Sequence, residues 1–507
     1  MTLLLLLGGG STSPTAGLSG DFALDGVKRP EYVYLGLEAG NHEPSEVKAP
    51  QVAKWRTASS TPNAGANTRQ RLLGMLSGGV FNVEFGSIWY AYDMPSDPQL
   101  SATASHYWMV EFAGKLYMGD GVDYLTYDPK KAELTKWESE GAGALPEKCK
   151  LAVVYHGRIV LARAEGEPQN WFMSAVSDPN DFDFFPPVFT KTQAIAGNLA
   201  EAEEVPDVVN TMIPYNDDLL IFGCDHSIWL LRGDPMDAGR LDNVSKTIGI
   251  AFGNSWCRDE RGVIFFFGSK GGVYRFVPGS LPEVLSDSRG GQDVSIQRRL
   301  TEIDLGLYRI DMAWDFERHG CRVVLVPVSE SETTNQLEYF WDSKTNAWSE
   351  DTKGAIALQA YCIASVDGDL PDDRRVVVGC QDGYLREYDR DAVNDDGTAI
   401  SSHVVIGPMT SGGDVEVILN RAKAILVASE YGCDFEVFAA TDPDIDFDTA
   451  VPAYTGRFNP GQNPRLPIRK RGSFVWLKLL NVHVGERWAI DELLVDLKAR
   501  GIRRVRA

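Results

Sequence analysis

The sequence predicts an all-β protein: a β-propeller of six to seven blades followed by a small C-terminal β-sandwich. Short apolar runs rich in β-branched and aromatic residues alternate with turns that contain Gly and Asp, a pattern typical of strands and hairpins. The pattern recurs every 45 residues or so, the period of a four-stranded propeller blade. We find almost no long amphipathic helix in the 507-residue chain, and its many aromatic residues favour sheets.

The chain begins with a run of leucines in front of a stretch rich in Gly and Ser. The run is too short for the core of a signal peptide or for a membrane span. We expect it to be an arm that adds a strand to its own sheet or to a neighbouring subunit, with a frayed tail as the alternative. Residues 1–70 are expected to form this arm and a loop-rich segment with one strand at 32–37. The leucines assigned to a subunit interface are Leu3, Leu4, Leu5, Leu6 and Leu7.

Two adjacent hairpins in the middle of the chain define the repeat. We expect Leu219–Phe222 to pair with Ile228–Leu231, and Val263–Phe267 to pair with Val273–Phe276. A glycine follows the first strand of each hairpin, and we interpret it as part of a tight turn. Neither hairpin can bury its apolar faces alone, so the unit is expected to stack on copies of itself.

The same glycine recurs along the chain, at Gly119, Gly223, Gly268 and Gly379. The two wider gaps lie between Gly119 and Gly223 and between Gly268 and Gly379. Each contains one further strand pair, at 157–174 and at 321–342 respectively. The stretch 79–90 is a divergent repeat. Together these repeats place the propeller at residues 71–409. A large β-sandwich with coincidental hairpins is the alternative.

The pattern changes after residue 410. Strands are expected at 415–427, 435–440, 471–483 and 488–498, and their alternation predicts a separate β-sandwich over 410–507. This end is rich in Lys and Arg, although the whole chain has a net charge of −22. We predict that it docks on an acidic partner such as the propeller of another copy, with a solvated tail as the alternative. The basic residues assigned to this interface are Arg500, Arg503, Arg504 and Arg506.

The composition argues against two kinds of site. A net charge of −22 disfavours general nucleic-acid binding, because binding to phosphates requires a basic face. The seven cysteines are scattered and mostly lie in apolar strands, with no Cys-x-x-Cys spacing. This pattern is typical of reduced, buried cysteine in a protein folded in a cytosol, and not of a zinc site.

Catalytic and cofactor-binding motifs are absent from the sequence. We find no phosphate-binding loop, no Gly-x-Ser-x-Gly elbow and no His-Glu-x-x-His, and no two of the seven histidines are close in the chain. We therefore expect no enzyme activity, no cofactor and no metal site. Acidic runs at 389–397 and 442–448 are the candidates for calcium, but neither has the spacing of a twelve-residue calcium loop. Paired carboxylates for glycoside hydrolysis stay open, because nothing in the sequence selects a pair.

Several of these motifs resemble a known family, the tail nozzle, tail tubular and related head–tail or hub proteins of bacteriophage virions. The similar segments are 174–182, 219–235, 248–250, Trp256, 265–274 and 493–501. The resemblance implies a structural virion protein that forms an oligomeric ring, six-fold, which lines or closes the DNA exit channel. An acidic wall that repels phosphate fits such a channel.

The resemblance also implies the partners and the location. The partners would be copies of the same chain, an adaptor or tube protein, and fibres or a needle. The location would be the virion after assembly in the host cytoplasm, with no membrane span and with DNA touching the wall only in transit. The first alternative function is a tail propeller that binds, or also cleaves, a receptor glycan, and the second is a cellular interaction scaffold.

Overall fold

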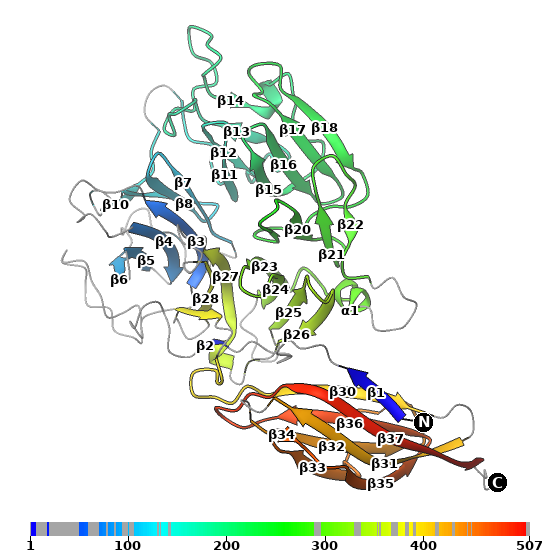
Figure 1. Ribbon diagram of the computed structural model, residues 1–507. Coiled ribbons are helices and arrows are strands. Elements are labelled where there is room, and N and C mark those ends of the chain that lie inside the picture. Colours follow the sequence, from blue (N-terminus) through cyan, green and yellow to red (C-terminus); the bar gives the residue numbers. More distant parts are fainter. Residues whose placement is uncertain are drawn as a thin grey trace. The chain divides into compact units, whose positions relative to one another are not determined.

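The protein is described by a computed structural model (Figure 1). Before residue 106 it describes Leu100 and the backbone of residues 2–6, 18–19, 50–58, 70–77, 80–85 and 88–93. From residue 106 to 502 it describes all residues except 129–130, 132, 140–142, 288–295, 329–335, 352, 354–355, 367–373, 381–384, 389–391, 411–414, 428–430, 444 and 448. It describes backbone alone at 357, 366, 385 and 500–502. The chain forms two compact units, residues 21–350 with 357–388, and residues 1–20 with 351–356 and 389–507.

The larger unit is a β-propeller, whose seven antiparallel sheets follow one another in chain order (Figure 1). The first sheet contains β3 (Pro50–Ala58), β4 (Gln70–Ser77), β5 (Val80–Phe85) and β6 (Ile88–Asp93). The second contains β7 (Trp108–Phe112), β8 (Lys115–Gly119), β9 (Tyr124–Asp128) and β10 (Glu133–Lys136). The third contains β11 (Leu151–Tyr155), β12 (Arg158–Ala162), β13 (Trp171–Met173) and β14 (Ile195–Ala196). The fourth contains β15 (Val209–Asn216), β16 (Leu219–Cys224), β17 (Ile228–Arg232) and β18 (Arg240–Ser245). The fifth contains β19 (Trp256–Arg258), β20 (Ile264–Phe267), β21 (Val273–Phe276) and β22 (Glu283–Val284).

The last two sheets complete the propeller. The sixth contains β23 (Tyr308–Asp315), β24 (Gly320–Pro327), β25 (Leu337–Asp342) and β26 (Ala347–Glu350), and the seventh begins with β27 (Ala360–Val366), β28 (Arg375–Cys380) and β29 (Leu385–Tyr388). The short elements between the sheets are η3 (Gly197–Leu199), α1 (Gln297–Thr301) and η4 (Ile356–Leu358), and the N-terminal segment holds the two-residue strand β2 (Leu18–Ser19). No helix in the described part of the chain is long and apolar enough to cross a membrane.

Neighbouring sheets pack face to face through buried apolar side chains. Between the third and fourth sheets, the rings of Trp171 and Phe222 stack with centroids 6.4 Å apart. Between the fifth and sixth, Phe265 stacks on Trp314 at 5.1 Å. Strand β27 of the seventh sheet contacts β3 of the first, so the sheets form a closed ring. Closure matters because it leaves few open strand edges.

The predicted fold class is confirmed. The expected central hairpin forms, with Leu220 of β16 opposite Leu231 of β17. The two strand pairs that lack the glycine become β12–β13 and β24–β25, and the divergent repeat becomes β5–β6. The propeller therefore has seven sheets among the described strands, the larger of the two predicted numbers.

The repeating glycines agree with the expected turn only in part. Gly268 does follow β20, and its N–H donates to the Gly272 carbonyl oxygen across the tight turn. Gly119 and Gly223 lie within β8 and β16, not in the turns that follow. A Cβ atom on Gly223 would lie 2.6 Å from Ile250 Cδ1 and 2.7 Å from Thr211 Cγ2, and one on Gly119 would lie 2.5 Å from the Trp108 ring. These glycines are needed where a bulky side chain crosses the strand closely.

The smaller unit is a β-sandwich of two antiparallel sheets. One sheet has the order β30-β36-β32-β33, and the other has the order β1-β37-β31-β34, with β35 also paired to β31. The strands are β1 (Thr2–Leu6), β30 (Ser402–Met409), β31 (Val415–Leu426), β32 (Cys433–Ala440), β33 (Tyr454–Phe458), β34 (Gly461–Gln462), β35 (Leu466–Gly472), β36 (Phe474–Asn481) and β37 (Ile490–Ile502).

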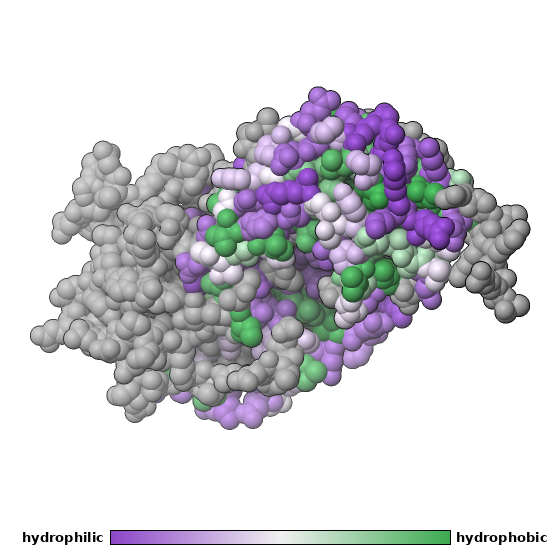
Figure 2. Space-filling view, turned by 90° about the horizontal axis from the view of Figure 1, so that it is seen from below, coloured by the Kyte–Doolittle hydropathy of each residue, from purple (hydrophilic) through white to green (hydrophobic). Residues whose placement is uncertain are grey.

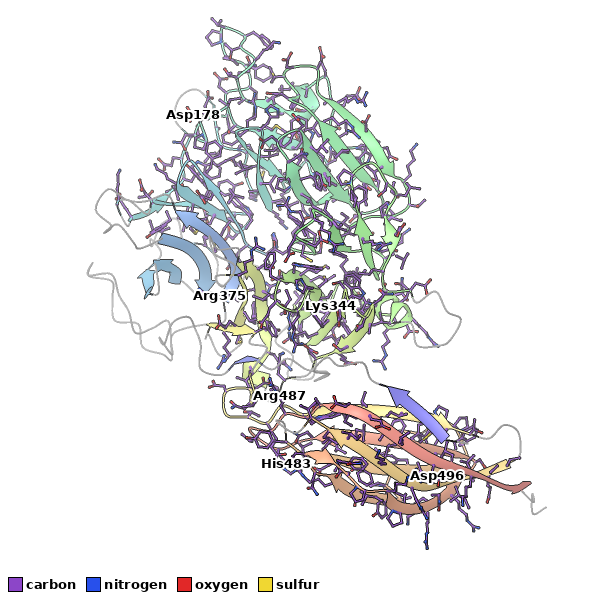
Figure 3. The ribbon with its side chains drawn as sticks, in the orientation of Figure 1. Asp178, Lys344, Arg375, His483, Arg487 and Asp496 are labelled. Atoms are coloured by element: carbon purple, nitrogen blue, oxygen red, sulfur yellow. The ribbon has the colours of Figure 1, made fainter. Side chains whose placement is uncertain are left out.

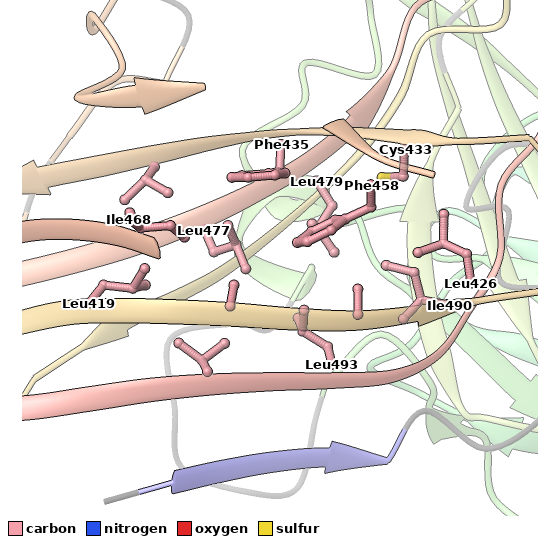
Figure 4. Close-up of a cluster of buried hydrophobic side chains, with 14 of the residues drawn as sticks. Leu419, Leu426, Cys433, Phe435, Phe458, Ile468, Leu477, Leu479, Ile490 and Leu493 are labelled. Carbon is pink, nitrogen blue, oxygen red and sulfur yellow. The ribbon is translucent and has the colours of Figure 1, made fainter. Parts of the chain in front are cut away.

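Alternating residues of these strands form the core of the sandwich, shown in Figure 4. Leu419 of β31, Phe435 of β32 and Leu477 of β36 are almost completely buried. Full burial of one such side chain contributes about 1.5–3 kcal/mol. The core therefore explains why this segment forms a unit of its own.

The leucine run forms strand β1 beside β37, with Leu3 opposite Val495 and Leu5 opposite Leu493 (Figure 4). It thus adds a strand to a sheet of its own chain. Strand β37 pairs with β31 on its other side, so β1 covers an edge that would otherwise be open. A contact of the leucines with a neighbouring subunit stays a prediction.

The expected domain limits of 1–70, 71–409 and 410–507 differ from the units of the structure. The first propeller sheet already begins at Pro50, and β30, before residue 410, belongs to the sandwich. Strand β30 pairs with β36, so that Ser402 lies opposite Asn481. Strands that pair over such a sequence distance leave no local hairpin pattern in the sequence. This is why the sequence analysis assigned the strand to the propeller. The strand expected at 32–37 lies outside the described residues.

Candidate functional site

The loop between β13 and β14 presents apolar side chains to solvent. Phe185, Val188 and Phe189 are 78%, 71% and 70% exposed, and we call these three residues the apolar tip. On the face shown in Figure 2, hydrophobic residues form patches among hydrophilic ones. Single exposed apolar residues are common, whereas a group on one segment indicates a contact surface.

Side chains at the base of this loop hold it in place. Asp178, labelled in Figure 3, lies near its start. The backbone N–H of Phe185 donates to the Asp183 carboxylate at 3.0 Å, which orders the turn before the tip. Phe182 is buried and meets the Trp137 ring edge-on at 6.1 Å. The loop is therefore packed on the second sheet just before the tip emerges.

Arg158 of β12 fixes both ends of the loop. Its guanidinium is fully buried and donates hydrogen bonds to the carbonyl oxygens of Ser174 at 2.9 Å, Lys191 at 3.0 Å and Gln193 at 2.5 Å. The Asp234 carboxylate lies 3.4 Å from it. Burial lowers the pKa of Arg158, and Asp234 opposes this change. A planar guanidinium suits the role because it can donate to several acceptors at once.

An open cavity lies on the third sheet near the start of this loop. Its volume is about 310 Å³, at the lower end of the range for small-molecule sites. It combines two aromatic rings with two carboxylates, and its lining is Pro146, Glu147, Ala164, Gly166, Glu167, Phe172 and Phe184. The Glu167 carboxylate accepts a hydrogen bond from Asn170 Nδ2 at 2.8 Å.

Three residues at one end of the fourth sheet, before β15 and in the β16–β17 turn, could together hold a metal ion. One ligand atom each of Asp207, Asp225 and His226 lies within 4.8 Å of the others. Asp207 already accepts hydrogen bonds from the His226 backbone at 2.9 Å and the Ser227 hydroxyl at 2.8 Å. Burial acts to raise the pKa of Asp207, but these hydrogen bonds outweigh it and the pKa lies below its ordinary value. The group thus has a structural role in ordering the β16–β17 turn.

The predicted interface residues can be placed only in part. Leu3 to Leu6 have backbone positions in β1, and Arg500 has one in β37 opposite Glu416, but their side chains are not described. Leu7, Arg503, Arg504 and Arg506 lie outside the described residues.

The calcium candidates are also incomplete. In the run 389–397, Asp395 forms an isolated bridge with Thr398, while residues 389–391 lie outside the described part. In the run 442–448, residues 444 and 448 are outside as well.

Sequence reasoning missed the apolar tip and its anchor. The segment 174–182 was singled out, yet the tip follows it directly. An available signal was the run Phe184-Phe-Pro-Pro-Val-Phe189, in which two prolines prevent a central strand although the residues are apolar.

The chain was also compared with known proteins. No family model matches it, and no curated protein matches it. The extracellular domain of the one-component system BT4673 from B. thetaiotaomicron is similar with 10% identity and a TM-score of 0.43, over 77% of this chain and 42% of that one. YCF48 bound to D1 peptide is similar with 11% identity and a TM-score of 0.37, over 70% and 99% of the two chains.

A chain of a mitotic checkpoint complex is similar with 10% identity and a TM-score of 0.38, over 70% of this chain and 98% of that one. The chain thus spans less than half of the B. thetaiotaomicron domain. At these identities and scores the similarities say nothing about function. The chain is an all-β protein with a β-propeller.

Proposed function

We propose that the chain is a structural, non-catalytic component of a bacteriophage tail or head–tail machine, and that copies of it join into a ring around the DNA exit channel. The observation that carries this proposal is the apolar tip on its fixed loop. Exposed Phe side chains gain most when another protein covers them, and a pre-ordered loop loses little entropy on binding. The sequence resemblance and the net charge of −22 point in the same direction.

Charges suggest how two copies would meet. The base of the loop carries Asp178, Asp181 and Asp183 beside the tip. The sandwich unit presents exposed basic side chains at Arg465, Arg469, Arg471 and Lys498. We infer that the tip and its acidic base contact the basic sandwich of the next copy. Complementary charges of this kind favour the correct orientation in an assembly.

The test is the mass of the purified protein in solution. Light scattering coupled to size exclusion, over a range of concentrations, should show a ring-sized species. The double variant Phe185→Ser and Phe189→Ser should shift it to monomer without changing the circular dichroism spectrum. Leu281→Ser, at a site that is 71% exposed between β21 and β22, is the matched control and should assemble normally. A wild-type protein that stays monomeric, or a double variant that assembles like the wild type, would contradict the proposal.

A glycan-binding tail propeller is the second candidate, and the cavity beside Phe172 and Phe184 is the observation that favours it. Aromatic rings stack on sugar faces and carboxylates accept hydrogen bonds from sugar hydroxyls. Titration of monomeric protein with host surface polysaccharide, followed by calorimetry, tests this candidate. Binding that Phe184→Ala abolishes and Phe185→Ser retains would support it over the first.

A further inference from the structure

Two cysteines from neighbouring propeller sheets meet in the interior. Cys257 belongs to β19 of the fifth sheet and Cys321 to β24 of the sixth, and their Sγ atoms lie 3.3 Å apart. Their residues are 6% and 0% exposed, and both are free thiols. The contact therefore links two sheets that no pairing among the described strands connects.

The packing around the thiols holds them in this position. Cys257 lies opposite Phe265 in its sheet, and Cys321 lies between Trp314 and Trp341 in the next. The three rings form one cluster, with Phe265 5.1 Å from Trp314 and 5.4 Å from Trp341. Because these large rings are themselves buried between the sheets, the two sulfur atoms have little freedom to turn away from each other.

We propose that Cys257 and Cys321 are a redox site, at which a small peroxide converts the two thiols into a disulfide that joins the fifth and sixth sheets. A disulfide bond is about 2.05 Å long, so the sulfur atoms need to approach by little more than about 1 Å. The cysteines are 64 positions apart in the chain, so the bond closes a long loop. Closing a long loop restricts the unfolded chain strongly and so stabilises the fold.

The chemistry balances with hydrogen peroxide as the oxidant. The thiolate of one cysteine attacks a peroxide oxygen, the O–O bond breaks, hydroxide leaves, and a sulfenic acid forms. The sulfur of the second cysteine attacks the sulfenic sulfur, the S–O bond breaks, and the oxygen leaves as water. The two thiols are oxidised by two electrons, and one peroxide becomes two waters.

Burial explains why the pair stays reduced until a peroxide enters. It raises the pKa of Cys257, so this residue is a thiol at neutral pH. Only the small fraction present as thiolate attacks peroxide, so oxidation is slow, and bulky thiol reagents cannot reach the site. In a cytosol the pair is therefore expected to remain reduced, whereas release into an oxidising medium would allow the disulfide to form.

The full chain, purified under reducing conditions, is the sample for the test. One portion is treated with hydrogen peroxide and one is not. Both are denatured, alkylated and digested, and the peptides are examined by mass spectrometry. We expect a cross-linked peptide pair that contains Cys257 and Cys321, lighter by two hydrogen atoms than the sum of its parts. The melting temperature should rise by several degrees and return to its first value with dithiothreitol.

Two variants make the result specific. Cys257→Ser should lose both the cross-link and the rise in melting temperature. Cys433→Ser removes a buried thiol from the sandwich core and should retain both effects. Sulfinic or sulfonic acid at Cys257 or Cys321 without a cross-link, no reaction at either, or a disulfide with a different partner would overturn the proposal.

Discussion

Replacing Arg158 should release the loop that carries the apolar tip. Arg158→Met keeps much of the side-chain volume but removes the donors to four backbone carbonyl oxygens and the cation beside Asp234. Removal of one member of a buried ion pair costs about 3–5 kcal/mol. The loop can open without unfolding the sheets, so we expect this cost to appear as local opening.

A change of about 3–5 kcal/mol corresponds to an increase of roughly 10²- to 4 × 10³-fold in the open population. Trypsin cleavage after Lys191, whose carbonyl Arg158 holds, reports that population when opening is fast relative to cleavage. We expect the rate at Lys191 to rise by this factor in Arg158→Met, while the urea midpoint of the propeller changes less.

Arg240→Met is the matched control, because Arg240 makes an exposed ion pair with Asp242. Such pairs contribute about 0–1 kcal/mol, so cleavage should change by less than about tenfold. An unchanged rate at Lys191 in Arg158→Met would refute the anchoring role. An equal rise in both variants would refute it as well, since it would point to a general effect of lost charge.

Three further predictions concern stability. Gly223→Ala should lower the free energy of unfolding by about 1–3 kcal/mol in urea, whereas Gly166→Ala, where an added Cβ meets nothing within 4 Å, should not. Asp207→Asn should be less stable than the wild type at pH 7. The difference should shrink and disappear as the pH falls through the lowered pKa of Asp207, because stability from a carboxyl with a lowered pKa is lost there. Phe435→Ala should cost the sandwich about 3–5 kcal/mol, and unfolding followed by a probe in that unit should show it.

The propeller was predictable because its signals are local. In β16 and β17, Leu219 lies opposite Arg232 and Gly223 opposite Ile228, so one hairpin carries its own register. A period built from such hairpins is visible in a single sequence. The function of the glycines was not visible, because the side chains that cross them, such as Ile250, come from the next connection.

The sandwich was predictable only as a set of strands. Its pairs join distant segments, as β30 with β36 and β1 with β37 do. Strand alternation shows which residues face the core, but it does not say which strands are neighbours. The limits of the unit therefore differed from those expected even where the strands themselves were found.

The apolar tip was hidden for a different physical reason. In the run from Phe182 to Phe189, burial changes completely within a few residues: Phe182 is 1% exposed and Phe185 is 78% exposed. Hydropathy assigns both the same value, so composition predicts core for both. What separates them is the anchor, since Arg158 and the Asp183 turn hold the chain ends on the sheet and leave the two-proline segment outside it. An apolar group kept outside by buried polar contacts is difficult to explain by the stability of the monomer alone. This is the physical reason for proposing that the apolar tip is a contact surface.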